Sequence, residues 1–110
     1  MKIILSTFPT LEGAESLAKV LLDKKIAACV QIHGPVQSMY NWENKLISDQ
    51  EWKISLKTKD DKVEEISKVL HEMHPYKVPQ WIEINGTGSL KYEKWVAEGL
   101  KERIIPLAWF

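Results

Sequence analysis

The first part of the chain carries two hydrophobic patterns, which predict a buried strand followed by an amphipathic helix. Residues 3–5 form a continuous apolar run, Ile-Ile-Leu, which is typical of a strand buried on both faces. From Thr10 to Lys25 the apolar residues recur three and four positions apart, as they do along one face of a helix. Thr10 is a suitable N-cap, and Lys24 and Lys25 place positive charge where the helix dipole favours it.

The next segment changes to a period of two and predicts a long β-hairpin. Apolar side chains alternate with polar ones through the stretch from Ala27 to Trp42. Gly34-Pro35 interrupts this stretch and predicts a bulge or bend, because proline cannot donate to a strand ladder. Glu43-Asn44-Lys45 predicts the turn, and the clear alternation of residues 52–58 predicts the return strand.

Two further helices and one strand are expected in the second half. Asp61 and Glu64 have the spacing of a capping box, and Pro75 ends the helix that follows them. Residues 81–84 predict a strand, and Ser89 can cap a last helix. The apolar positions of the two helices are Val63, Ile66, Val69, Leu70 and Met73, and then Tyr92, Trp95, Val96, Gly99 and Leu100.

Some of these positions carry specific packing predictions. Met73 continues the apolar stripe of its helix, and Trp95 lies among the apolar residues of the last helix, so we expect both in the core. Gly99 weakens its helix by up to ~1 kcal/mol relative to alanine, so it is expected to mark close packing. The tail 104–110 is apolar throughout, and we expect it to be docked against other parts of the protein.

The order strand, helix, strand, strand, helix, strand, helix predicts an α+β, ferredoxin-like (βαββαβ) sandwich with helices on one sheet face. A continuous strand over 27–42 would reach roughly 50 Å, whereas a compact domain of this length has a radius of gyration near ~13 Å. Such a ribbon would expose apolar residues and be marginal in water. We therefore expect a closed homo-oligomer; the alternative is that the bulge folds the ribbon back onto its own sheet.

Composition narrows the function classes. The chain is long enough for one domain, residues 1–110, and its formal net charge of zero argues against nucleic acid as a partner. No run approaches the ~20 apolar residues of a membrane span. The apolar run after Met1 is too short for a signal peptide, so a cytoplasmic address is expected. Cys29 is the only cysteine, which excludes an internal disulfide and a thiolate metal cage within one chain.

The segment His74–Pro79 is the most informative stretch for function, because its two prolines hold polar aromatic groups on a stiff connection that we expect at the surface. The plainer interpretation is a helix stop with a histidine near a helix C-terminus. No Ser/His/Asp order with supporting turn chemistry is present, and Gly86-Thr87-Gly88 lacks the longer fingerprint of a phosphate loop. We therefore expect a protein that is not an enzyme.

Short motifs along nearly the whole chain resemble those of the CutA divalent-cation tolerance family. They are Ser6-Thr7-Phe8-Pro9, Ala27-Ala28-Cys29-Val30, Tyr40-Asn41-Trp42-Glu43-Asn44-Lys45, Leu56-Lys57-Thr58, His74-Pro75-Tyr76-Lys77-Val78-Pro79 and Tyr92-Glu93-Lys94-Trp95. The resemblance implies a ferredoxin-like fold, a homotrimer built through the long hairpin, and an architecture shared with trimeric PII signalling proteins. It also implies a cytosolic role in tolerance of copper and other divalent metals.

The resemblance also implies positions for a copper site. The matching residues are Ser6, Met73 and His74, of which only His74 is a strong ligand. Met73 offers a soft thioether to Cu(I), while Ser6 is a poor copper ligand. We therefore expect at most weak binding of copper or another divalent metal.

Three functions remain as hypotheses. The first is a trimer in metal homeostasis, with weak metal binding at His74. The second is a PII-like regulator that binds a small anionic ligand in clefts between subunits. The residues expected in that cleft are Tyr40, Trp42, Lys57, His74 and Tyr76. The third is a stable trimeric scaffold without a ligand.

Overall fold

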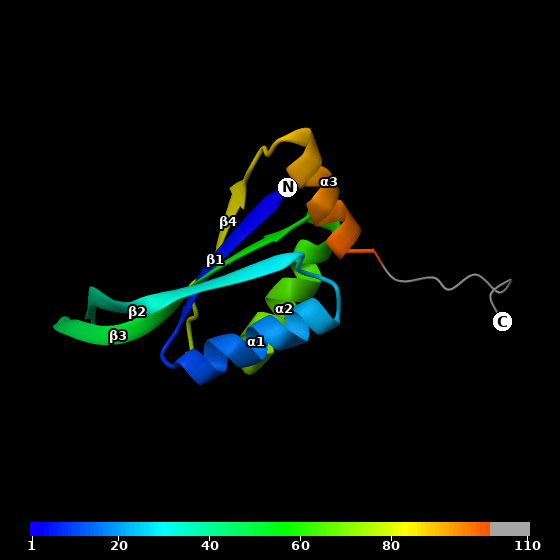
Figure 1. Cartoon of the computed structure of the whole chain (residues 1–110). Helices are drawn as coiled ribbons and strands as arrows, with labels where there is room; N and C mark the ends of the chain where they lie inside the picture. Colours follow the sequence, from blue (N-terminus) through cyan, green and yellow to red (C-terminus); the bar gives the residue numbers. More distant parts are fainter. Residues whose placement is uncertain (102–110) are drawn as a thin grey trace, which may run out of the picture.

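The computed structural model describes residues 1–101 of the 110-residue chain, so the tail 104–110, which was predicted to be docked, lies outside the described residues. The element order confirms the predicted βαββαβ pattern followed by a third helix (Figure 1). The elements are β1 (Lys2–Phe8), α1 (Leu11–Asp23), β2 (Cys29–Trp42), β3 (Lys45–Thr58), the 3-10 turn η1 (Asp60–Lys62), α2 (Val63–Met73), β4 (Ile82–Asn85) and α3 (Leu90–Gly99).

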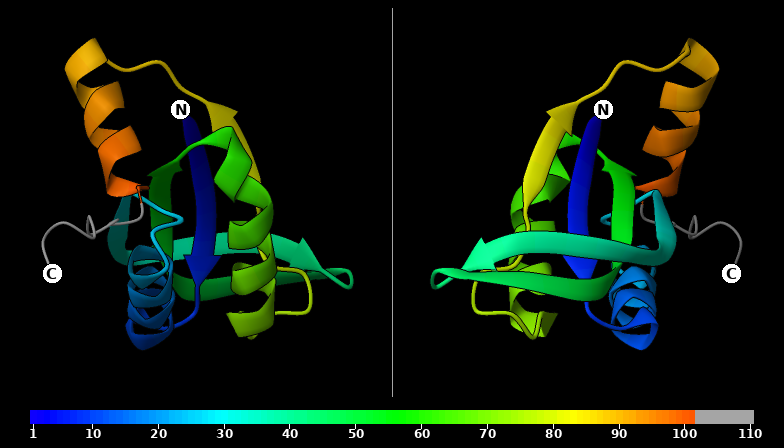
Figure 2. Two further views of the ribbon diagram at one scale, coloured as in Figure 1. Left: turned by 90° about the vertical axis from the view of Figure 1, so that its right-hand side faces the viewer. Right: turned by 90° about the vertical axis from the view of Figure 1, so that its left-hand side faces the viewer.

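The four strands form one antiparallel sheet in the order β2-β3-β1-β4. Helices α1 and α2 lie side by side over one face of this sheet and leave the other face without a helix (Figure 2). Ile4 points toward the helices and is completely buried, while its neighbours Ile3 and Leu5 point the other way and are half-buried. The prediction that this run is buried on both faces is therefore wrong for a single chain.

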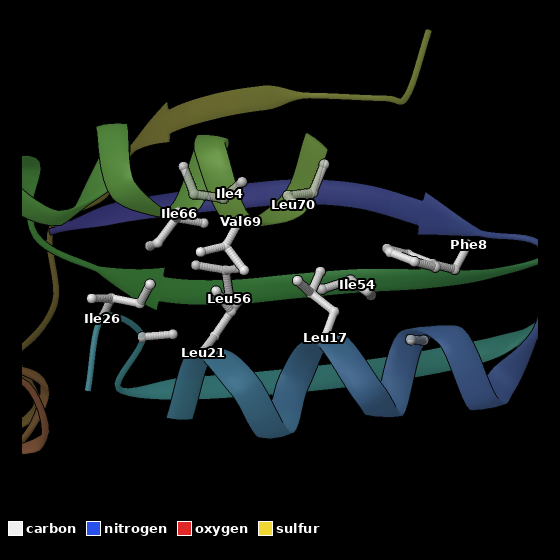
Figure 3. Packing of buried hydrophobic residues seen from close by; sticks show 12 residues of the cluster. Ile4, Phe8, Leu17, Leu21, Ile26, Ile54, Leu56, Ile66, Val69 and Leu70 are labelled. Atoms are coloured by element: carbon white, nitrogen blue, oxygen red, sulfur yellow. The ribbon is translucent and has the colours of Figure 1, made fainter. Parts of the chain in front are cut away.

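The core fills the layer between the sheet and the two helices (Figure 3). Leu17 and Leu21 of α1 meet Ile54 and Leu56 of β3, and all four side chains are almost completely buried. Burying each such side chain contributes about 1.5–3 kcal/mol. The remaining buried members of this core cluster are Ile4, Phe8, Ala14, Ile26, Ala27, Ile66, Val69 and Leu70.

Two of the three predicted helix caps are confirmed. The Thr10 hydroxyl accepts from the Gly13 amide at 3.0 Å, and the Ser89 hydroxyl accepts from the Tyr92 amide at 3.2 Å. The capping box predicted for Asp61 and Glu64 is wrong, because the N-cap position of α2 is Lys62 and it makes no side-chain cap bond. Only one residue separates β3 from η1, so the chain turns sharply there and Asp61 lies inside the 3-10 turn.

Three packing predictions on the helices can be compared with the structure. Met73 is 37% exposed and Trp95 is 53% exposed, so neither is a core residue of the single chain. Trp95 instead stacks on the ring of Tyr92, with centroids 5.7 Å apart. Gly99 does mark close packing: a Cβ added there would lie 3.2 Å from the Cβ of Ala28, which explains why this helix position carries glycine.

The hairpin of β2 and β3 extends away from the core, as predicted, rather than folding back (Figure 1). It gives the molecule a long axis of 63 Å against 30 and 22 Å for the other two, and a radius of gyration of 16.2 Å. The predicted bulge is confirmed by a register shift between His33 and Val36, which brackets Gly34-Pro35. The outer part of the hairpin exposes apolar side chains, among them Met39, Trp42 and Leu46.

Candidate functional site

His74 lies directly after α2, where the backbone turns extended ahead of Pro75. Its Nε2 lies 2.6 Å from the carbonyl oxygen of Thr7, and its Nδ1 accepts from the Tyr76 amide at 3.1 Å. Nε2 must therefore carry the proton, because a carbonyl only accepts. Both ring nitrogens are engaged within the chain, so a metal ion would have to displace one of these partners.

The prediction that His74 lies at the surface is wrong. The side chain is only 8% exposed and its ring lies 4.2 Å from that of Phe8 and 4.8 Å from that of Tyr76, measured between centroids. A neutral imidazole with a partner on each nitrogen is buried at little cost, which is why the loop can turn inward here.

Tyr76 links this loop to the base of the hairpin. Its hydroxyl donates to Oε2 of Glu51 at 3.0 Å, and Glu51 is only 7% exposed. Burial, followed by the hydrogen bond to the Glu51 carboxylate, raises the pKa of Tyr76 well above its ordinary value. The phenol is therefore held in its protonated, donating form.

A second tyrosine-carboxylate pair lies farther out on the same hairpin. The Tyr40 hydroxyl donates to Oδ2 of Asp49 at 2.7 Å, and this hydrogen bond raises the pKa of Tyr40. Asp49 and Glu51 are two residues apart on β3, so both carboxylates lie on the same side of the strand. We call Tyr40, Asp49, Glu51, His74 and Tyr76 the junction cluster. Asp49 and Glu51 were missed in the sequence, where the only signal was their alternation along a return strand.

The remaining predicted cleft residues lie elsewhere. Trp42 pairs with Lys45 at the end of the hairpin and is 51% exposed. Lys57 is at the other end of β3, and its Nζ donates to Oε1 of Gln31. The β3 partner of Tyr40, Ile47, is ten residues from Lys57, or about 33 Å along the strand. One chain thus brings Tyr40, His74 and Tyr76 together but not Lys57.

The positions matched to a copper site are largely occupied by internal contacts. The Ser6 hydroxyl donates to the carbonyl oxygen of Gln80 at 2.7 Å and is almost completely buried. Within residues 1–101, no group of three or more His, Cys, Asp or Glu side chains is arranged to hold a metal ion. A further histidine, His71, is exposed on α2, where its Nδ1 lies 2.7 Å from the carbonyl oxygen of Ser67.

A hollow of about 580 Å³ lies between α2 and β4, and none of the predicted cleft residues lines it. Lys2 lies in its wall, with its Nζ 3.8 Å from Asp60 and 3.9 Å from Glu83. The indole of Trp81 donates to the same glutamate at 3.0 Å. This hollow could not be predicted from sequence, because its wall joins Lys2 to residues 60–83. No helix among residues 1–101 is both long and apolar enough to cross a membrane.

The model of the CutA1 divalent ion tolerance protein family matches residues 2–99, nearly the whole described chain. The chain belongs to the CutA family. The divalent-cation tolerance protein CutA of Pyrococcus horikoshii is 37% identical over 103 residues, which cover 93% of this chain and 100% of that protein. The chloroplastic CutA of Arabidopsis thaliana is 35% identical over 95 residues, which cover 86% of this chain and 52% of that protein.

Solved CutA structures share the fold. The crystal structure of CutA1 from Ehrlichia chaffeensis is 31% identical, covers 92% of this chain and 95% of its own, and superposes with a TM-score of 0.87. A structure described as the periplasmic divalent cation tolerance protein CutA of Archaeoglobus fulgidus is 36% identical, with a TM-score of 0.87 and coverage of 92% and 100%. The predicted family and ferredoxin-like fold are thereby confirmed.

Proposed function

We propose that this CutA-family protein acts in tolerance of divalent cations as a non-enzymatic homotrimer. The observation that best supports assembly into a trimer is the exposed apolar surface of the hairpin, where Met39 is 60% exposed, Trp42 51% and Leu46 68%. A two-stranded ribbon with such side chains is marginal in water unless another surface covers it. The match of residues 2–99 to the CutA1 family model, and the 37% identity to a divalent-cation tolerance protein, support a role in cation tolerance.

The helix-free face of the sheet offers a second surface for assembly. Ile82 and Ile84 of β4 are 43% and 41% exposed and lie beside Leu5 and Ile3 of β1. A closed assembly in which each subunit covers both the β1–β4 part of this face and its neighbour's hairpin buries all of these side chains.

Sedimentation at low micromolar concentration tests the trimer. We expect a single species of three subunits, and dissociation or aggregation when Trp42 and Leu46 are both replaced by serine. Leu90→Ser is the matched control, because Leu90 is 91% exposed on α3 and lies outside both apolar surfaces. A wild-type protein that sediments as a folded single subunit contradicts the proposal.

We further propose that any copper or other divalent metal binds weakly, at His74, with the Met73 thioether beside it. The hydrogen bonds of His74 to Thr7 and Tyr76 support weak rather than strong binding, because the ring must give up one of them to coordinate. The partly exposed position of Met73 leaves its sulfur accessible.

Calorimetric titration with Cu(I), Cu(II) and Zn(II) tests this part of the proposal. Binding is expected to be saturable and weak, to disappear in His74→Ala and to persist in His71→Ala, which removes an exposed histidine from the same helix region. Loss in His71→Ala with retention in His74→Ala would refute the assignment, and no binding in wild type would leave the scaffold hypothesis.

A second candidate function is that of a regulator that binds a small anion between subunits. It is favoured by Lys57, which forms no ion pair within the part of the chain that the structure describes. Because Tyr40 lies far from Lys57 in one chain, a shared cleft requires the hairpin of a neighbouring subunit. Ligand-induced stabilisation that is lost in Lys57→Ala would support this function.

The cytoplasmic address stays a prediction, since the names of relatives include chloroplastic and periplasmic proteins.

A further inference from the structure

The helix-free face of the sheet is divided into an apolar half and a polar half. The apolar half lies on β1 and β4, where Ile3, Leu5, Ile82 and Ile84 are adjacent. The polar half lies on β2 and β3, the hairpin strands, where they run beside the core (Figure 2). Its side chains point away from the helices, because their neighbours Val30, Ile32, Ile54 and Leu56 pack into the core on the opposite face.

Cross-strand pairing arranges the side chains of the polar half in two rows, one on β2 and one on β3. His33 lies opposite Lys53, and Gln31 lies opposite Ser55. Lys57 follows one pair farther along β3, and its ammonium group reaches back to the Gln31 side chain. Two lysines thus flank a central pair of neutral hydrogen-bonding groups, and the Cα atoms of Lys53 and Lys57 are about 13 Å apart along the strand.

The positive charge of this surface is not balanced inside the described chain. The lysines that form ion pairs there are Lys2, Lys59 and Lys101. The carboxylate that follows on the same side of β3 is Glu51, which is buried and accepts the Tyr76 hydroxyl. A doubly charged oxyanion bound over Ser55 would lie between the two lysine ammonium groups. The Ser55 hydroxyl and the Gln31 side-chain amide could also donate hydrogen bonds to it.

We infer that Lys53 and Lys57, with Ser55 and Gln31 between them, form a binding site for a small doubly charged oxyanion, either a phosphate or a dicarboxylate. The inference rests on the second candidate function, the anion-binding regulator, and places the centre of its site where β2 and β3 run beside the core rather than on the outer part of the hairpin. Lysine is suited to this role, since its ammonium acts as a point charge on a flexible stem.

Titration calorimetry at low ionic strength, with inorganic phosphate and with succinate, tests the site and separates the two chemistries. Lys53→Gln and Lys57→Gln are each expected to weaken binding of the preferred anion about tenfold or more, because each removes a charge-assisted hydrogen bond. Ser55→Ala is expected to weaken it by a smaller factor. The matched control is Lys45→Gln, which removes an exposed lysine from the same strand near the hairpin turn and is expected to leave affinity unchanged.

The outcomes distinguish this site from the broader function. Anion binding that is lost in Lys57→Gln and in Tyr40→Phe but unchanged in Lys53→Gln would overturn the sheet site while keeping the inter-subunit cleft. No saturable binding of either anion would overturn both. Equal weakening in Lys45→Gln would show diffuse charge attraction and overturn the site. Sedimentation of Lys53→Gln is run in parallel, and a changed assembly state would assign Lys53 to an interface and likewise overturn it.

Discussion

The two tyrosine-carboxylate pairs of the junction cluster provide a matched test of how much burial strengthens one hydrogen bond. Tyr76 donates to Glu51 at 3.0 Å, and Tyr40 donates to Asp49 at 2.7 Å. The acceptors are two residues apart on β3, yet Glu51 is buried and Asp49 is exposed. Replacing each tyrosine by phenylalanine removes the same hydroxyl from two different environments.

The expected magnitudes follow from what replaces the lost donor. In Tyr76→Phe an oxygen of the buried Glu51 loses its partner, and leaving such a group unsatisfied costs about 1–3 kcal/mol. Because Tyr76 itself is only partly buried, water reaches the site, and we expect the lower half of that range, about 1–2 kcal/mol. In Tyr40→Phe water takes over the exposed carboxylate, so the loss of stability should be clearly smaller.

Equilibrium urea denaturation followed by tryptophan fluorescence measures both losses, with subunit concentration held constant because assembly contributes to stability. The double variant Tyr76→Phe/Glu51→Gln should lose less than the sum of the two single variants, since both remove the same bond. Equal losses for Tyr76→Phe and Tyr40→Phe, or a larger loss for Tyr40→Phe, would refute the reasoning from burial.

Three further predictions concern the core, one close contact and pH. Leu56→Ala opens a cavity in the completely buried centre and should cost about 2–5 kcal/mol in urea denaturation, and a loss below this range would mean that the core collapses around the gap. Gly99→Val forces new methyl groups against Ala28 and should destabilise by about 1–3 kcal/mol, and an unchanged urea midpoint would show that α3 shifts freely. The Gly88 amide, followed by Lys59, lowers the pKa of Glu93, so the stabilisation from Glu93 is present above the ordinary glutamate pKa and lost as pH falls through the lowered value. Acid titration of Glu93→Gln should therefore show a shallower loss of stability below the ordinary pKa than wild type, and parallel curves would contradict this.

The spacing of apolar residues, together with the Gly34-Pro35 pair, was enough to predict the element order, the long hairpin and its bulge. These features depend on local periodicity and on the chemistry of proline and glycine, which the sequence states directly. The failures at Met73 and Trp95 have a common physical reason. Helical spacing identifies an apolar side chain but does not say whether it is covered by the same chain or left at the surface.

The candidate site was harder to predict because it depends on contacts between distant segments. The burial of His74 follows from its bond to Thr7, which lies 67 residues earlier in the chain. The cleft predicted between subunits includes Lys57 and Tyr40, which lie far apart along the hairpin of one chain, so it would have to combine residues of two subunits. Motif order therefore located the residues along the chain but did not give their distances in space.

The register shift between His33 and Val36 also affects how this hairpin can change in evolution. Across it β2 advances by three residues while β3 advances by two, from Lys53 to Glu51. Before this point odd-numbered residues of β2 pair with odd-numbered residues of β3, whereas beyond it even-numbered residues of β2 pair with odd-numbered residues of β3. β2 thus carries one extra residue here, and a one-residue deletion at the bulge would restore a regular ladder with Tyr40 still opposite Ile47. A one-residue deletion in the regular part of β2 would instead move every later side chain of the strand to the opposite side of the ribbon. The bulge is therefore the place within β2 where the loss of a single residue leaves the two faces of the ribbon unchanged, a tolerance that the strand otherwise has only at the turn.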